Sequence, residues 1–140
     1  MELSDISTPA LAYLGDSVLE VCVRTYLVTE LGLSTSAHLN RASLDFVRAT
    51  AQSEAMGRIE PCLTEAEAAV YRRGRNMGHG NVPKSASVAE YRRATGMEVL
   101  FGYLSLTGQR ERMDSLFRVG YGLTNSDACE QNQSGEDGHE

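Results

Sequence analysis

Tryptophan is absent from this 140-residue sequence, proline occurs only three times, and no apolar run approaches the roughly 20 residues that a membrane-spanning helix needs. We therefore expect no membrane partner. The three cysteines, Cys22, Cys62 and Cys129, are widely spaced and lack any Cys-x-x-Cys or Cys/His pattern, which argues against a disulfide framework and a structural zinc. Basic residues are also missing from the first segment, MELSDIS, where a secretion signal would carry them, so we expect a cytoplasmic protein.

The composition that is present is typical of one folded domain. Apolar residues make up 41% and charged residues 23% of the chain, which excludes a fibrous or wholly disordered protein. The net charge of -6 is unevenly distributed, because five acidic residues and no Lys or Arg follow Leu123, which leaves only -1 on the body up to Gly122. We expect residues 1–122 to form the domain and residues 123–140 to be an acidic, disordered tail.

Apolar residues in the body recur at helical spacing, and no segment alternates with the period of two that a half-buried strand requires. The predicted helices span about residues 9–29, a segment between 34 and 59 with a break near residue 50, and about residues 64–73, 87–107 and 109–119. Thr8 with Pro9 indicates a helix start, and Thr64 with Glu67 is a capping-box pattern. The glycine-rich segment 74–85 is predicted to be a loop. The fold class is therefore all-α, with five to seven helices.

Two acidic residues lie in unexpected places on these predicted helices. Asp16 follows Gly15 at the shoulder of an apolar helix face, and Glu98 lies on a helix that is apolar around most of its circumference. A buried carboxylate needs a cationic or hydrogen-bonding partner. One alternative is an ion pair with an arginine such as Arg24 or Arg92. The other is that Asp16 and Glu98 meet at a hard divalent cation, for which carboxylate oxygens are the natural ligands.

Three separated segments match, in order, the motifs of a known family. LAYLGDSVLE (residues 11–20) resembles the signature segment of ribonuclease III catalytic domains, and TGMEVLFGYLSLTGQ (residues 95–109) resembles the helix that carries their second pair of acids. RRGRN (residues 72–76), together with VPK (residues 82–84) and the brevity of the chain, resembles the Mini-ribonuclease III branch, which lacks a double-stranded-RNA-binding domain. The resemblance covers about residues 8–120.

This resemblance implies a ribonuclease III-like endonuclease domain that forms a homodimer and cleaves double-stranded RNA with Mg²⁺, or with Mn²⁺ as a substitute. In this branch it implies maturation of 23S ribosomal RNA precursor ends, with a ribosomal protein on the substrate as a further candidate partner. Asp16 and Glu98 align with acids of the family, so both carry over as catalytic metal ligands. Ala12 and Thr95 stand where the longer enzymes have a glutamate and an aspartate, a departure that the short branch shares.

Other residues have candidate roles around such a site. Six of the 22 residues from 72 to 93 are Lys or Arg and only one is acidic, and guanidinium groups suit phosphate. We expect contacts with the RNA backbone and 2′-hydroxyls, because the major groove of duplex RNA is too narrow to read. The predicted RNA-binding residues are Arg72, Arg73, Arg75, Asn76 and Lys84. Glu20 and Thr95 are candidate supporting residues, with a solvent-side ion pair as the alternative for Glu20, and Leu14 and Val18 are candidates for the dimer surface.

Two other functions fit the same residues. The first is a non-catalytic helical module that binds structured RNA through residues 72–93, with Asp16 and Glu98 in structural ion pairs. The second is a dimerisation or scaffold protein whose basic segment has no nucleic-acid partner. Metal-dependent cleavage of an RNA duplex distinguishes a nuclease from both.

Overall fold

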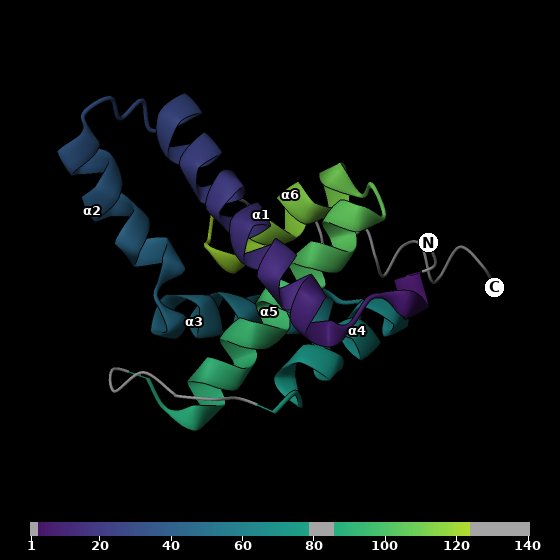
Figure 1. Cartoon of the computed structure of the whole chain (residues 1–140). Helices are drawn as coiled ribbons and strands as arrows, with labels where there is room; N and C mark the ends of the chain where they lie inside the picture. The colour runs from purple at the N-terminus through teal and green to yellow at the C-terminus, as the bar shows by residue number, and fades with distance from the viewer. Residues whose placement is uncertain (1–2, 79–85, 124–140) are drawn as a thin grey trace.

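The computed structural model describes residues 3–78 and 86–123, which form six α-helices and two short 3-10 helices (Figure 1). The helices are α1 (Thr8–Thr29), α2 (Ser36–Val47), α3 (Ala49–Ile59), α4 (Glu65–Arg75), α5 (Val88–Leu106) and α6 (Arg110–Gly120), with 3-10 turns at Leu3–Asp5 and Glu60–Cys62. These described residues contain no strand, so the expectation of an all-α fold with five to seven helices is confirmed. The predicted tail lies outside the described residues from Thr124 onward, as does Lys84.

Local sequence accounts for most helix ends. The capping box at the start of α4 is present as predicted, since the Thr64 hydroxyl accepts from the backbone N–H of Glu67 while the Glu67 carboxylate accepts from that of Thr64. The N-cap of α1 is Ser7 rather than Thr8. The break between α2 and α3 falls at Arg48, whose ψ of 146° is extended, two residues earlier than expected.

Helix α5 lies at the centre of the molecule. It packs against α1, α3, α4 and α6, and Figure 1 shows α1 crossing in front of it. Nine of its 19 residues are buried, including Met97, Leu100 and Phe101, which have no exposed surface. This burial explains why the sequence of α5 is apolar on nearly all sides, and it makes the carboxylate of Glu98 exceptional.

The crossing of α1 over α5 is a contact between two backbones. A Cβ atom on Gly15 would overlap the carbonyl oxygen of Glu98, and a Cβ atom on Gly102 would overlap the carbonyl oxygen of Leu11. Glycine at both positions therefore allows the two helices to approach more closely than any side chain would permit. The contact fixes Asp16, the residue after Gly15, at the level of Glu98.

Helix α2 is peripheral and contributes little to the core. It extends to one side of the molecule in Figure 1, and none of its residues is fully buried. Phe46 is one of its attachments to the core, since its ring centre lies 4.9 Å from that of Tyr121 and its carbonyl oxygen accepts a 2.7 Å hydrogen bond from the Tyr121 hydroxyl. Its exposed charged residues are therefore suitable control positions.

The cysteines differ from expectation at one position. Cys62 is disulfide-bonded, whereas Cys22 is a free, half-buried thiol whose pKa is raised to about 11 by burial. The cysteine spacing argued against a disulfide framework, and Cys62 is the exception to that prediction. No helix in residues 3–78 and 86–123 is both long and apolar enough to cross a bilayer.

Candidate active site

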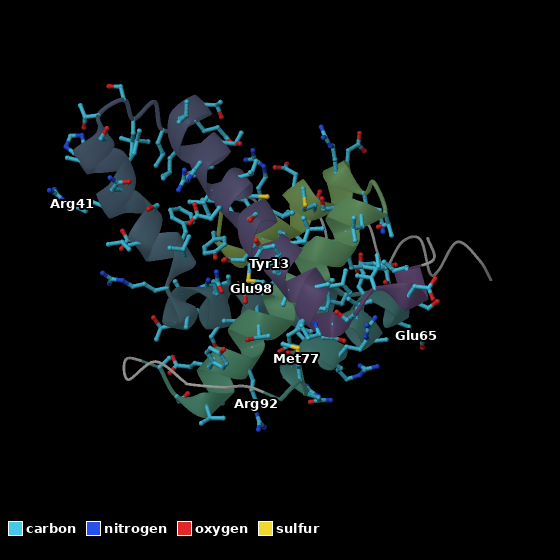
Figure 2. All side chains as sticks on the ribbon, viewed as in Figure 1. Tyr13, Arg41, Glu65, Met77, Arg92 and Glu98 are labelled. Carbon is cyan, nitrogen blue, oxygen red and sulfur yellow. The ribbon has the colours of Figure 1, made fainter. Side chains whose placement is uncertain are left out.

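Asp16 and Glu98 lie together where α1 crosses α5. Figure 2 shows Glu98 at this crossing, and Arg92 nearer the start of α5. Asp16 is exposed to solvent, while Glu98 is half-buried beneath α1. The two acids are 82 residues apart in the chain and are brought together by the close backbone contact at Gly15. The expected convergence of these two carboxyl groups is therefore present in the structure.

The electrostatics of the pair differ from those of an ordinary surface acid. Burial, a hydrogen bond with the Asp16 side chain and the negative charge of Asp16 together raise the pKa of Glu98 to about 8. Each of these effects disfavours a second negative charge beside the first. Among the described residues, no positive charge is a cause of the shift in the pKa of Glu98.

The arginines that could have neutralised Glu98 are engaged or directed elsewhere. Arg24 donates to Glu20 over 2.7 Å, and Arg92 is exposed near the other end of α5. Within residues 3–78 and 86–123, no ion pair includes Asp16 or Glu98. The alternative of structural ion pairs for the two acids is therefore not found in the described part of the chain.

The two carboxyl groups fit a hard divalent cation that keeps other ligands. Their oxygens are the donor type that Mg²⁺ and Mn²⁺ prefer, and an added positive charge would offset the repulsion between them. In the described ranges no third His, Cys, Asp or Glu side chain joins them in a group of ligating geometry. Such a set of two carboxylates suits Mg²⁺, which commonly retains water and takes substrate phosphate as further ligands.

The two supporting candidates have local partners. The carboxylate of Glu20 is occupied by Arg24 one turn further along α1, which is the solvent-side ion pair considered as its alternative role. The hydroxyl of Thr95, which is buried one turn before Glu98, donates to the carbonyl oxygen of Tyr91 over 3.0 Å. Neither side chain is joined to the Asp16–Glu98 pair by a hydrogen bond in the described residues.

The predicted RNA-binding residues divide into two groups. Arg72 and Asn76 are exposed at the end of α4, and the guanidinium of Arg75 lies 5.7 Å from the centre of the Tyr71 ring. These three residues are available at one surface of the molecule. Lys84 lies outside the described residues.

Arg73 has a different environment from its neighbours. Its guanidinium donates to the hydroxyl of Thr8 over 3.2 and 3.0 Å and to the carbonyl oxygen of Ile6 over 3.3 Å. These bonds connect the end of α4 to the start of α1, the helix that carries Asp16. The structure therefore supports a positioning role for Arg73, which the sequence did not indicate because the contact spans 65 residues.

Glu67 is a buried acid for which the sequence pattern predicts only a role in the helix cap. Arg112 of α6 donates to both of its carboxylate oxygens over 2.9 Å and to the carbonyl oxygen of Cys62 over 2.7 Å. Burial alone would raise the pKa of Glu67, but the hydrogen bonds from Arg112 and the Thr64 backbone, with the charge of Arg112, lower it. This bidentate ion pair has a structural role.

Comparison with known proteins places this chain in a family. Residues 9–109 match the model of the ribonuclease III domain. A Mini-ribonuclease 3 of Symbiobacterium thermophilum is 49% identical over 110 residues, 78% of this chain and 83% of that protein. One of Clostridium tetani is 36% identical over 118 residues, 84% and 78% of the two chains. A crystal structure of a Fusobacterium nucleatum protein superposes with a TM-score of 0.74 at 28% identity, over 82% of this chain and 91% of that one.

The helical architecture and the matched segment thus define a ribonuclease III domain. The chain belongs to the ribonuclease III domain family and, within it, to the Mini-ribonuclease 3 branch. This membership confirms the enzyme class expected from the sequence, an endoribonuclease that acts on double-stranded RNA.

Proposed function

We propose that this endoribonuclease cleaves double-stranded RNA at the Asp16–Glu98 pair, with these two residues as ligands of a catalytic Mg²⁺ ion. One observation carries the proposal: two carboxyl groups from crossing helices lie together, and the described residues supply no cationic side chain between them. Without a cation, the pair relieves this repulsion at neutral pH by keeping a proton on Glu98, whereas a bound divalent cation would let both carboxyl groups ionise. Mn²⁺, which takes the same oxygen ligands, would substitute for Mg²⁺.

The residues of the chain have distinct tasks in this mechanism. A bound Mg²⁺ supplies Lewis-acid stabilisation of charge on the phosphate and makes an attacking water more acidic. Asp16 is exposed and offers its carboxylate toward an incoming RNA strand. Glu98 is held from the opposite helix in a half-buried setting, where electrostatic interactions are stronger than in water. The glycine contact between the two helices fixes the spacing of both ligands.

RNA binding is assigned to the end of α4. Arg72, Arg75 and Asn76 present two guanidinium groups and an amide beside the basic segment that continues to residue 93. Lys84, which lies outside the described residues, stays a predicted RNA-binding residue. These contacts go to the backbone and 2′-hydroxyls, so recognition is mainly of duplex shape. Affinity should fall strongly with salt, because phosphate contacts release counterions.

We infer a homodimer, because a duplex has two strands and one chain offers one pair of acids. Tyr13 is 84% and Val21 is 63% exposed on α1, and large exposed apolar side chains mark interaction surfaces when they cluster. Leu14 and Val18 are half-buried. Val18 and Val21 line a groove of about 380 Å³ between α1 and α6, which supports this face as the dimer surface.

The proposed cellular role is the one that the resemblance to the Mini-ribonuclease III branch implies. The proposed substrate is the precursor of 23S ribosomal RNA, cleaved near its ends in the cytoplasm, with a ribosomal protein on the substrate as a candidate partner. The proposed catalytic domain is residues 1–122, and the acidic tail 123–140 has no catalytic task.

The test compares the purified protein with Asp16→Asn and Glu98→Gln on a labelled RNA duplex. Asp45→Asn, which removes an exposed acid from the peripheral α2, is the matched control. We expect cleavage by the wild type and the control in Mg²⁺, none in EDTA, and at least about a 100-fold loss in the two site variants, because Lewis-acid stabilisation amounts to several kcal/mol. Near-normal cleavage by folded Glu98→Gln would overturn the site assignment.

A further inference from the structure

A second concave site lies between the end of α4 and the start of α5, apart from the acid pair. It is a cavity of about 550 Å³ lined by three guanidinium groups, from Arg75, Arg92 and Arg93. Val88 and Ala89, the first two residues of the 19-residue helix α5, also line it. The positive end of a helix dipole therefore adds to the three arginine charges. Glu60 is the acidic residue of the lining.

Tyr71 supplies an independent indication that the cavity takes a ligand. The residue is only 1% exposed and lines the cavity, yet its hydroxyl has no hydrogen-bond partner in the described structure. A buried hydroxyl without a partner is unfavourable and rare in folded proteins. The charges that act on this hydroxyl come from Glu60, Arg75 and Arg93, which line the same cavity. Tyr71, a lining residue, therefore carries an unused hydrogen-bond donor.

The arginines keep most of their donors free. Arg75 donates through Nε to the amide oxygen of Asn76 over 3.3 Å, and Arg93 donates through Nε to the hydroxyl of Ser53 over 2.8 Å. In the described residues neither is held in an ion pair, and the exposed Arg92 has neither an ion pair nor a hydrogen bond.

Two carboxylates oppose this positive charge. They are Glu60 in the lining and Glu90, which lies near Arg93 and already accepts from the Ser87 backbone. Because the lining itself holds three guanidinium groups and one carboxylate, the cavity remains positive.

We propose that this cavity binds a phosphate group of the RNA backbone other than the one being cleaved, and so positions the duplex on the enzyme. The inference rests on the proposed function. Guanidinium, phenol and helix N-terminal N–H groups are all donors, so the ligand they fit is an anion that only accepts, and arginine matches phosphate oxygens in bidentate fashion. Because the Tyr71 hydroxyl is buried, its contact with the phosphate requires neighbouring side chains to move when the RNA binds.

The location of the cavity separates its phosphate from the reacting one. Arg92 precedes Glu98 by six residues on α5, which is about 9 Å along a helix axis. Figure 2 shows Arg92 nearer the start of the helix and Glu98 beneath α1. A single phosphate cannot contact both positions, but successive parts of one duplex can. The cavity therefore extends the RNA surface from the acid pair toward the end of α4.

The experiment measures binding and cleavage of a short labelled RNA duplex by the full chain and two variants. Tyr71→Phe removes only the unpartnered hydroxyl, and Arg92→Gln removes one exposed guanidinium. Arg41→Gln, an exposed arginine of α2, is the matched charge control (Figure 2). Affinity is measured by fluorescence anisotropy in EDTA at several salt concentrations, and cleavage in Mg²⁺ gives KM and kcat separately. A third arm follows the thermal midpoint as inorganic phosphate is added.

We expect Arg92→Gln to weaken duplex binding and raise KM about tenfold, and Tyr71→Phe about threefold to tenfold, with kcat within about twofold of the wild type. Arg92→Gln should also reduce the slope of log affinity against log salt by about 1. Arg41→Gln should show a smaller change in affinity. A purely structural Tyr71 would leave binding unchanged in Tyr71→Phe, because its hydroxyl makes no bond that folding would lose.

Two results would overturn the inference. Normal RNA binding by both variants would exclude an RNA phosphate. If phosphate then raised the thermal midpoint of the wild type but not of Tyr71→Phe, the cavity would be a site for free phosphate instead. Failure of the proposed function is distinguishable, because the wild type itself would then neither bind nor cleave the duplex.

Discussion

Glu67 and Glu98 are glutamates on two packed helices, and burial acts in the same direction on both carboxyl groups. Their pKa values nevertheless move in opposite directions, down for Glu67 and up to about 8 for Glu98. The two pKa values differ because the neighbouring groups differ. Glu67 is hydrogen-bonded to the guanidinium of Arg112, whereas Glu98 lies beside the carboxyl group of Asp16. The carboxylate of Glu67 is neutralised by a cation of the chain and has a structural role, whereas Glu98, set against another acid, is the proposed ligand of a cation from outside.

The largest expected effect separates activity from stability at these two glutamates. Glu98→Gln should lose at least about 100-fold in cleavage, yet its free energy of unfolding without metal should equal or exceed that of the wild type, since a repelled carboxylate is removed. Mg²⁺ should raise the thermal midpoint of the wild type more than that of the variant. Urea unfolding and cleavage assays measure both quantities. If Glu98→Gln were strongly destabilised, Glu98 would have a structural role like that of Glu67.

The next effect concerns the contact that brings Asp16 to Glu98. Gly15→Ala places a Cβ atom against the carbonyl oxygen of Glu98, so the helices must separate. We expect a loss of about 3 kcal/mol in unfolding free energy, at the upper end for overpacking, and a fall in kcat in the remaining folded protein. Gly57→Ala on α3 is the control, because open space surrounds it. That variant should gain roughly 0.5 to 1 kcal/mol from helix propensity and keep full activity.

Glu67→Gln should lower the stability and leave the activity unchanged, which is the opposite of the result expected for Glu98→Gln. It leaves the guanidinium of Arg112 without its carboxylate, and we expect a loss of about 2 kcal/mol in unfolding free energy. Gln can still accept from the Thr64 backbone, which limits the loss. The kcat of the folded variant should be unchanged, measured well below its unfolding temperature. A large fall in kcat would connect the Arg112 pair to the active site.

The Glu67–Arg112 ion pair also predicts that the free energy of unfolding falls in acid. Because the folded-state pKa of Glu67 lies below its ordinary value of 4.5, its stabilising contribution is complete above about pH 4.5. It is lost as the pH falls through the lower folded-state pKa and the carboxylate becomes protonated. The difference in unfolding free energy between wild type and Glu67→Gln should therefore narrow in acid. A gap that stays constant down to pH 3 would contradict the ion-pair account.

The smallest effect is expected at the exposed pair beside the site. Glu20→Gln and Arg24→Gln each break an ion pair in which the arginine is largely exposed, and we expect changes below about 0.5 kcal/mol in stability. Cleavage by Glu20→Gln should stay within about twofold of the wild type. A much larger loss in Glu20→Gln alone, with Arg24→Gln normal, would show that Glu20 acts on the reaction.

Local features of the fold were predictable from the sequence, and long-range pairings were not. The cap at Thr64 and Glu67 depends on neighbours three residues apart, so its pattern is visible in the chain. The misplaced charge of Glu98 was visible too, because it interrupts an apolar helix. The pairing of Glu67 with Arg112, 45 residues away, has no local signal. The contact of Arg73 with Thr8 likewise has no local signal, because in the sequence Arg73 does not differ from the neighbouring arginines.

The crossing at Gly15 and Gly102 has a consequence for how this enzyme can be altered. The gap between the two acids is set by main-chain atoms in contact rather than by the shapes of aliphatic side chains. Volume-conserving exchanges such as Leu for Met elsewhere in the interior can therefore change the thermal stability without changing the spacing of Asp16 and Glu98. A search for a more thermostable variant could therefore use volume-conserving substitutions in the interior and would keep both glycines.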